Sequence, residues 1–242
     1  RTLRKEGMPI NFTLGFSARQ NYLAARLSNP NFVNVFLGRL NQVVTENSLG
    51  GGALVGEKVT LATQEALLKT RKQFSEISTR LIGASIRSGE QIAFLAGLDV
   101  MTIPPPAMEE FLKMQDLVST MNSNIGKVIE PDINFRHSQG ARFTKLWELS
   151  DTFIQFVNDL VASANLDKMS GSEMELFCRE RNVDLFYPFS DEQLKKILDM
   201  GKIPILDEWS QDIALDDLMT QSALQSFAKD QAALDHRIRS FL

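Results

Sequence analysis

Two arginines of this sequence follow short apolar segments in a way that could create an anion site. Arg39 follows the apolar run 32–37, and Arg87 follows the run 79–85. A guanidinium group binds a phosphate through two parallel hydrogen bonds, and the hydroxyl of Ser85 could complete the coordination. The same arginines could instead pair with surface carboxylates. The sequence leaves both alternatives open.

Polar residues also alternate with apolar ones in the segment 9–16 and in the run 32–37. Asn11 and Thr13 lie two residues apart, as do Asn34 and Phe36, so each pair shares one face of a predicted strand. Polar side chains on the inner face of a sheet either satisfy one another as structural groups or hydrogen-bond a substrate hydroxyl and a catalytic water. Both roles are open for Asn11 and Thr13.

The elements that must position these residues alternate between strands and helices. We predict strands over residues 9–16, 32–37, 79–85 and 99–103, and helices over residues 17–29, 58–74, 88–96 and 108–117. Such succession predicts a parallel sheet covered by helices, in which residues just past the carboxyl ends of the strands form the site. An open doubly wound sheet and a closed barrel both agree with this pattern.

Glycine-rich phosphate-binding motifs are not found. Neither GxGxxG nor GxxxxGK[ST] occurs in the sequence, which disfavours a dinucleotide or P-loop site. The three glycines at 50–52 follow a helical segment rather than a strand, so a flexible turn is favoured over a phosphate cradle.

The second half of the chain is predicted to be helical. Residues 148–200 form an amphipathic region with breaks near residues 170 and 188, and a last helix covers 214–242. The aromatic residues of this region are expected to form a small core of their own. The basic residues Arg136, His137, Arg142 and Lys145 favour a solvated face over a second anion site.

Composition excludes several classes of function. The chain has 242 residues with 26 basic and 30 acidic side chains, a net charge of −4, so we expect no nucleic-acid or membrane partner held by charge. One cysteine and two histidines exclude a disulfide framework and disfavour a metal site. No apolar stretch of about 18 residues occurs, and we expect a cytoplasmic protein.

Four segments together carry a resemblance to a known family. They are NFTLGFS at 11–17, FLGR at 36–39, GASIR at 83–87 and AGLDVMTI at 96–103. In order and spacing they resemble the second half of transaldolases, and FAKDQAAL at 227–234 resembles the closing helix of that family. The resemblance covers residues 1–120 and 214–242.

The resemblance implies an α/β fold, the (β/α)8 TIM barrel. This chain would supply strands five to eight, the C-terminal helices and a helical insertion near residues 148–203. Residues 1–127 would form the second half of the barrel, residues 128–213 a connecting segment with the insertion, and residues 214–242 a C-terminal helix that packs on the barrel.

The same resemblance implies a reaction. Transaldolases transfer a dihydroxyacetone unit between sugar phosphates, within the pentose phosphate pathway, through a Schiff base on a lysine and without a metal or organic cofactor. Carried over to this sequence, Arg39, Arg87 and Ser85 would bind the phosphate, Asn11 would bond a ketose hydroxyl, and Thr13 would help hold the catalytic water.

Two further positions refine the comparison. Phe36 stands where transaldolases have Phe and the related fructose 6-phosphate aldolases have Tyr, which favours the transferase over the lyase. Asn34 stands where transaldolases usually have Ser, so its contact to substrate is expected to differ.

The Schiff-base lysine has no candidate on the predicted strands. Lys58, Lys69 and Lys72 lie in a predicted helix and Lys113 follows the last strand, so the resemblance assigns the lysine to the region before Arg1. We therefore expect a missing N-terminal half of the barrel, or a second copy of the chain, as a partner, and self-association of the chain alone. The alternative from another class is a non-catalytic barrel used for binding or scaffolding.

Overall fold

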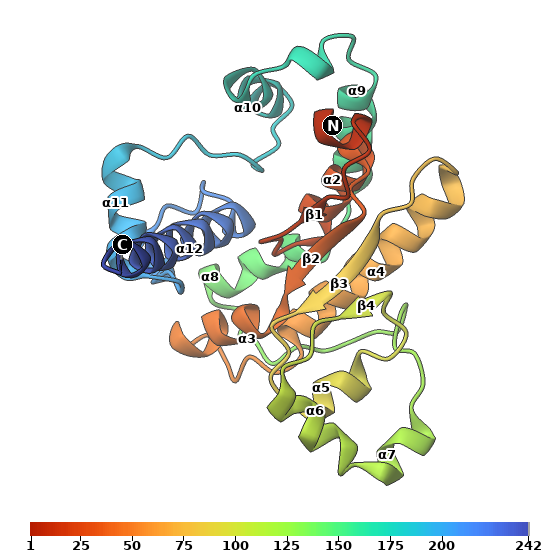
Figure 1. Ribbon diagram of the computed structural model, residues 1–242. Coiled ribbons are helices and arrows are strands. Elements are labelled where there is room, and N and C mark those ends of the chain that lie inside the picture. Colours follow the sequence, from red (N-terminus) through yellow and green to blue (C-terminus); the bar gives the residue numbers. More distant parts are fainter. Residues whose placement is uncertain (242) are drawn as a thin grey trace.

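The computed structural model describes residues 1–241 of the chain. Its centre is a parallel sheet of four strands in the order β1-β2-β3-β4 (Figure 1). The strands are β1 (Asn11–Phe12), β2 (Phe32–Phe36), β3 (Arg80–Ala84) and β4 (Val100–Met101). Each strand lies beside the one that follows it in the chain, without the reversal of a doubly wound sheet. The described sheet thus has the sequential order that a (β/α)8 barrel requires.

The two outer strands are shorter than predicted from the sequence. Residues 9–16 and 99–103 were expected to be extended throughout, yet only Asn11–Phe12 and Val100–Met101 are paired as strands. Each of these strands has a neighbour on one side only, so a ladder of hydrogen bonds holds just the residues that face that neighbour.

Helices connect the strands and follow the last one. They are α2 (Ala18–Ser28), α3 (Leu37–Glu46), α4 (Val55–Gln73), α5 (Gly89–Phe94), α6 (Pro105–Leu112) and α7 (Gln115–Thr120). Ser17 and Ser88 occupy the N-cap positions of α2 and α5, where each side chain accepts a backbone N–H of the first turn. Helix α3 agrees with the helical segment expected before the glycines at 50–52, but the sequence did not predict that it begins directly after β2.

The two faces of the sheet are buried to different extents. Val33, Val35 and Leu81 are completely buried, and the register Val33↔Leu81 places them on the face that the helices cover. Asn34 and Ile82 are also paired and, being one residue further along, lie on the opposite face. Asn11 and Asn34 therefore lie on the face of the sheet that is opposite to the connecting helices.

The C-terminal region is helical, and its helices contribute to two cores. Its elements are α8 (Ser138–Ala141), α9 (Asp151–Val161), α10 (Gly171–Glu180), α11 (Asp191–Met200) and α12 (Leu215–Arg239), with the 3-10 turns η1 (Arg142–Leu146), η2 (Leu166–Lys168) and η3 (Leu206–Glu208). Helices α11 and α12 pack into the core of the sheet, whereas α9 and α10 form a second, smaller one. Phe156, Leu160 and Cys178 are buried together with Tyr22 and Leu23 of α2. The expected small aromatic core is therefore present, and through Tyr22 and Leu23 it includes part of α2.

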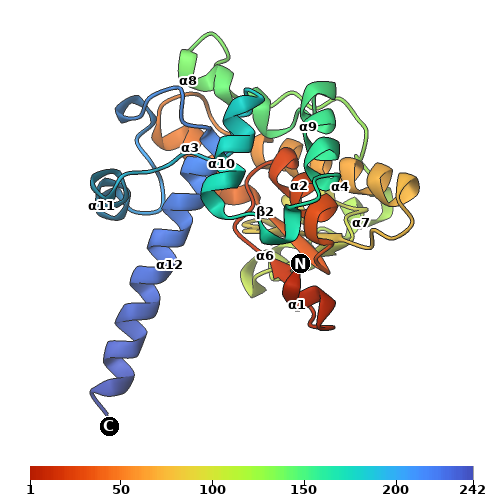
Figure 2. The same ribbon diagram turned by 90° about the horizontal axis from the view of Figure 1, so that it is seen from above.

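Helix α12 begins inside the molecule and ends outside it. Leu218 and Met219 near its start are completely buried, whereas the second half projects away from the remaining chain (Figure 2). A short helix, α1 (Thr2–Lys5), lies at the other end of the chain. Among the described residues, no helix is both long and apolar enough to cross a membrane.

Candidate functional site

Asn11 and Asn34 contact each other on the open face of the sheet. The Asn34 Nδ2 donates to Asn11 Oδ1 at 2.5 Å and to the Phe12 carbonyl at 3.2 Å. Asn34 is buried, while Asn11 and Thr13 are exposed. The structure therefore brings together two of the predicted polar residues and leaves the amide of Asn11 and the hydroxyl of Thr13 accessible to a ligand.

Arg39 is a buried cation without a counter-charge. It lies in the first turn of α3 and is only 9% exposed. The rings of Phe16, Phe36 and Phe227 surround its guanidinium carbon at 6.0, 5.8 and 5.9 Å from their centroids. Within residues 1–241 the buried Nη1 has no hydrogen-bond partner, although buried polar groups are ordinarily paired. This atom therefore lacks the acceptor that a buried guanidinium nitrogen ordinarily has.

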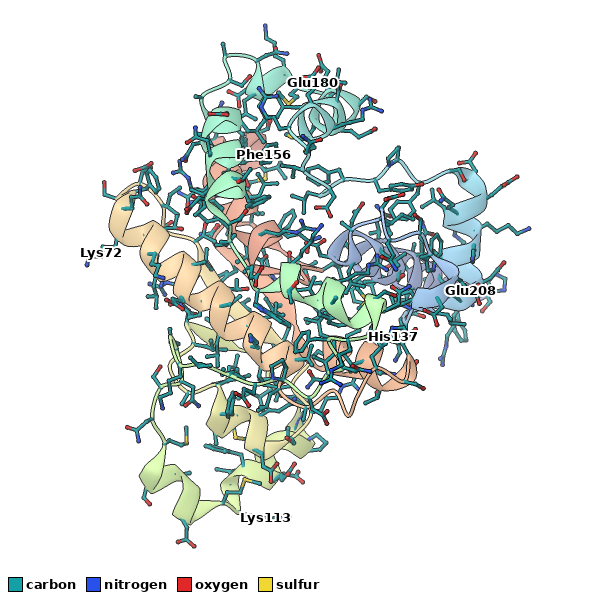
Figure 3. The ribbon with its side chains drawn as sticks, turned by 180° about the vertical axis from the view of Figure 1, so that it is seen from behind. Lys72, Lys113, His137, Phe156, Glu180 and Glu208 are labelled. Atoms are coloured by element: carbon teal, nitrogen blue, oxygen red, sulfur yellow. The ribbon has the colours of Figure 1, made fainter. Side chains whose placement is uncertain are left out.

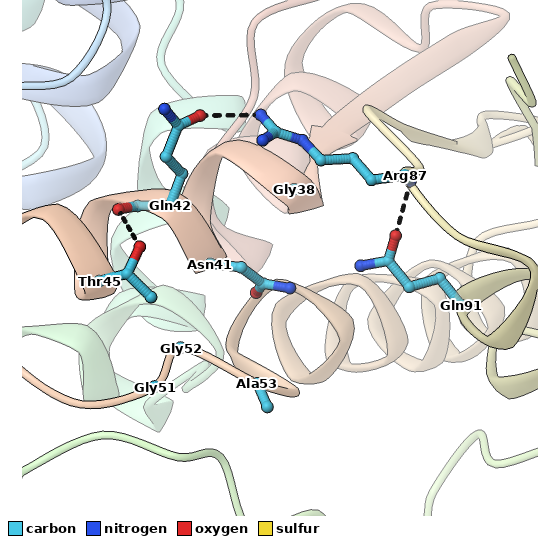
Figure 4. A pocket seen from close by; sticks show the side chains of 9 residues that line it. All are labelled: Gly38, Asn41, Gln42, Thr45, Gly51, Gly52, Ala53, Arg87 and Gln91. Carbon is cyan, nitrogen blue, oxygen red and sulfur yellow. Dashed lines mark hydrogen bonds between the residues drawn. The ribbon is translucent and has the colours of Figure 1, made fainter. Parts of the chain in front are cut away.

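Arg87 is the second cation of this region. Its Nη2 donates to the Oε1 of Gln42 at 2.9 Å, and its backbone N–H donates to the Oε1 of Gln91 at 2.7 Å (Figure 4). Burial lowers the pKa of Arg39, and the positive charge of Arg87 lowers it further. The positive charge of Arg87 thus acts unfavourably on the charged guanidinium of Arg39.

The alternative of surface ion pairs does not agree with these contacts. In the described part of the chain neither Arg39 nor Arg87 forms an ion pair with a carboxylate. Ser85 lies between the two arginines in the chain and has a left-handed backbone with φ 66°, a conformation that costs energy for a residue with a side chain. Guanidinium groups without carboxylate partners can bind an anion such as phosphate.

A small pocket lies beside Arg87. It has a volume of about 260 Å³ and is lined by Gly38, Asn41, Gln42, Thr45, Gly51, Gly52, Ala53, Arg87 and Gln91 (Figure 4). The three-glycine segment therefore borders this pocket. The glycine segment is packed against Asp132. The Gly52 N–H donates to the Asp132 carbonyl at 2.9 Å, and a Cβ at Gly51 would lie 2.2 Å from Asp132 Oδ2.

Comparison with known proteins assigns the chain to a family. Residues 1–166 match the sequence profile of the family described as Transaldolase/Fructose-6-phosphate aldolase. The chain belongs to this family. The match confirms the resemblance of the four segments, and the parallel α/β sheet agrees with the barrel fold of transaldolases.

Curated transaldolases are similar to slightly less than half of the chain. A probable transaldolase of Parvibaculum lavamentivorans is 33% identical over 111 residues, which are 45% of this chain and 44% of that protein. A probable transaldolase of Thermus thermophilus is 34% identical over 113 residues (46% and 44%), and a transaldolase of Chlamydia caviae is 31% identical over 117 residues (48% and 35%). The chain thus spans less than half the length of these relatives.

None of the four described strands of this transaldolase-family chain carries a lysine. The Nζ of Lys58 donates to the Ile129 carbonyl at 3.0 Å, and Lys69 pairs with Glu65 on α4. Lys72 and Lys113 lie at the periphery of the molecule (Figure 3). The sequence prediction that these lysines are on helices or beyond the last strand is confirmed.

The basic residues 136–145 do not converge on one ligand in this family member. Arg142 donates to Gln139 Oε1 at 2.6 Å and to the Ile213 carbonyl, and Lys145 pairs with Asp184 at 2.7 Å. Arg136 is exposed. These contacts favour the interpretation as a structural and solvated region over a second anion site.

Sequence reasoning missed residues that contact the two arginines. Phe227 was placed in the closing helix of the transaldolase family but not beside Arg39, because no local pattern connects residues so far apart in the chain. Gln42 and Gln91 were missed since neutral amides on helices carry no distinctive signal. The left-handed backbone of Ser85 had no glycine to indicate it.

Proposed function

We propose that this chain supplies the phosphate-binding half of a transaldolase-type enzyme, which transfers a dihydroxyacetone unit between sugar phosphates through a Schiff base on a lysine. Family membership supports transferase activity in general. The observation that carries the proposal is the buried guanidinium of Arg39, with its unpartnered Nη1 and no carboxylate to neutralise it among the described residues. A phosphate group would provide both the missing acceptor and the missing charge.

Arg39, Arg87 and Ser85 would together hold the phosphate of the substrate. The phenylalanine rings around Arg39 exclude water, which strengthens its attraction to an anion. Since the two cations repel each other, a dianion between them would relieve that repulsion. The phosphate would then fix the position of the sugar chain relative to the sheet.

Asn11, Thr13, Asn34 and Phe36 would face the reacting part of the sugar. Because the Oδ1 of Asn11 accepts from Asn34, its Nδ2 remains to donate to a ketose hydroxyl. Thr13 would help hold the catalytic water, and Asn34 would position Asn11. Phe36 has no hydroxyl group to hold a water, which supports a transferase over an aldolase that cleaves its substrate.

The lysine of the Schiff base is assigned to the other half of the barrel, because the four described strands contain none. In this assignment residues 1–127 form strands five to eight, residues 128–213 the insertion and residues 214–242 the closing helix. The free edges of β1 and β4 support it, since both would be paired in a closed barrel. A pocket of about 520 Å³ beside β1, lined by Phe12, Thr13 and Leu166 among others, provides room for a neighbouring strand.

Trapping of the Schiff base tests this function. The complete barrel, with residues 1–242 joined to the first four strands, is treated with fructose 6-phosphate and sodium borohydride, and the adduct is located by mass spectrometry. We expect an adduct on a strand lysine of the first half and none within residues 1–242. An adduct on a lysine of this chain contradicts the assignment.

Two alternatives give different results in related assays. A fructose 6-phosphate aldolase-like lyase would release products without an acceptor aldose phosphate, whereas a transaldolase requires the acceptor for turnover. A non-catalytic binding barrel is suggested by the Asn34 amide and by the strands without lysine. It would bind sugar phosphates yet give no adduct even in the complete protein.

A further inference from the structure

The guanidinium of Arg87 lies against α3 and is held there by neutral groups. Its Nη2 donates to Gln42 Oε1 at 2.9 Å, and its backbone N–H donates to Gln91 Oε1 at 2.7 Å (Figure 4). The side chain of Arg87 is exposed, so nothing but the Gln42 contact restrains its far end among the described side-chain hydrogen bonds. Without that contact the flexible arginine would be free to move into solvent.

The surface of α3 is shaped to receive this side chain. A Cβ at Gly38 would lie 2.7 Å from the Nε and 3.1 Å from the Cδ of Arg87, and 2.3 Å from the Ser85 carbonyl. Gly38 and Gln42 are four residues apart on a helix and therefore lie on one face. The arginine thus passes over the glycine and ends at the glutamine one turn further along.

The orientation of the Gln42 amide is itself fixed. Its Nε2 donates to the Oε1 of Glu46, one turn further along α3, so its oxygen faces Arg87. A carboxamide oxygen accepts a hydrogen bond without neutralising the guanidinium charge. Arg87 is therefore restrained while its positive charge remains available to an anion.

We propose that Gln42 is a positioning residue for phosphate binding, which holds the Arg87 guanidinium over the first turn of α3, the turn that carries Arg39, before the substrate arrives. The two cations repel each other, so a free Arg87 would move away from Arg39, and the ligand would have to bring it back. Restraint in the binding position lowers that cost. This inference rests on the proposed phosphate site.

The test measures binding of inorganic phosphate to the 242-residue chain by NMR titration. We expect Gln42→Met to weaken phosphate binding about three- to tenfold, the effect of one hydrogen bond to a charged group at a partly exposed site. In an Arg87→Met background the same substitution is expected to have no further effect. A positioning role also predicts that the Nε–H signal of Arg87 moves toward the position of a free arginine in Gln42→Met.

A matched control is Gln155→Met. Gln155 of α9 donates to Asp159 four residues further on at 2.7 Å, as Gln42 does to Glu46, but it lies on another helix. Its substitution is expected to leave phosphate affinity unchanged. Circular dichroism and the thermal midpoint of each variant show whether the fold is retained.

The outcomes separate the inference from the proposed function. If Arg39→Met leaves phosphate affinity unchanged, or if the wild-type chain binds no phosphate, the phosphate site itself is wrong. If Arg39→Met weakens binding but Gln42→Met does not, the role of Gln42 is wrong. An equal loss from Gln42→Met with and without Arg87 also overturns it, because the effect would then not pass through Arg87.

Discussion

Asp217 is a buried carboxyl group whose neighbours leave its charge largely uncompensated. Arg19, the nearby cation, forms two hydrogen bonds of 2.7 Å with the adjacent Asp216. Burial and the charge of Asp216 together raise the pKa of Asp217 to about 7, although the hydrogen bond from the Tyr187 N–H and the charge of Arg19 act in the opposite direction. Asp217 thus gains or loses its proton near neutral pH.

This shift predicts a pH-dependent stability. In the unfolded chain the carboxyl ionises near pH 3.8 and in the folded chain near pH 7, so the unfolded state binds fewer protons in between. The free energy of unfolding therefore falls as pH rises across this window. Asp217→Asn keeps an acceptor for the Tyr187 N–H and removes this pH-dependent loss of unfolding free energy. For the wild type the loss amounts to at most about 4 kcal/mol.

Urea unfolding at about pH 5 and pH 8 measures the effect. We expect Asp217→Asn to be more stable than the wild type at the higher pH and to show a flatter pH profile between the two conditions. Asp199→Asn, at an exposed position of α11, is the control. A wild-type profile in the Asp217→Asn variant would contradict the assignment of the pH dependence to this group.

At the scale of elements, Asp99 connects helix α4 to the sheet. It accepts hydrogen bonds from both Nη atoms of Arg71 at 2.9 and 3.0 Å, from Gln64 at 2.9 Å and from the Leu81 N–H at 3.0 Å. Burial raises the pKa of Asp99, but the bonds from Arg71, Gln64 and Leu81 outweigh it, so the pKa lies below its usual value. One carboxylate thus connects α4, β3 and the start of β4.

Asp99→Ala is expected to lower the free energy of unfolding by about 2–4 kcal/mol at neutral pH, because Arg71 and the Leu81 N–H lose their partner. The stabilisation by Asp99 is present above its unfolded pKa and is lost as the pH falls through its lower folded pKa. The matched control is Glu65→Ala, which removes the exposed Glu65–Lys69 pair of the same helix. That change is expected to cost about 0.5 kcal/mol or less, and equal losses in urea unfolding would refute the role of Asp99.

Elements with local signals were predictable from the sequence, and those without them were not. Ser17 and Ser88 marked the starts of α2 and α5 because their hydroxyls cap these helices. Helix α3 follows β2 with Phe36 at its N-cap and no side-chain cap, so no residue marked where this helix begins. The sequence therefore located Arg39 at the end of a strand but could not show that a helix surface holds Arg87.

The site was predictable to the extent that parallel strands place their carboxyl ends together. This rule brought Asn11, Asn34, Arg39 and Arg87 into one hypothesis without any knowledge of long-range contacts. The contact of Phe227 with Phe36 and Arg39 depends on how the last helix crosses the molecule. Such a contact is a property of tertiary packing, for which the sequence has no period or cap.

At the scale of the whole molecule, two surfaces of the described residues could pair with another chain. The strands β1 and β4 have unpaired edges within the described sheet, and α12 exposes one apolar face. On that face Leu224, Phe227, Leu234 and Ile238 are between 43% and 52% exposed. Their spacing of three, four or seven residues aligns them along one side of the helix, which projects from the remaining chain (Figure 2).

These surfaces predict self-association of the chain, and the α12 face is expected to be its main cause because it is large and freely accessible. Leu234→Glu combined with Ile238→Lys places an ion pair on the apolar face, so the mass measured by light scattering after gel filtration should fall toward that of one chain. Ala232→Glu with His236→Lys adds the same charges at the same spacing on the opposite face and should leave association unchanged. If the first variant associates as the wild type does, the sheet edges rather than α12 hold the copies together.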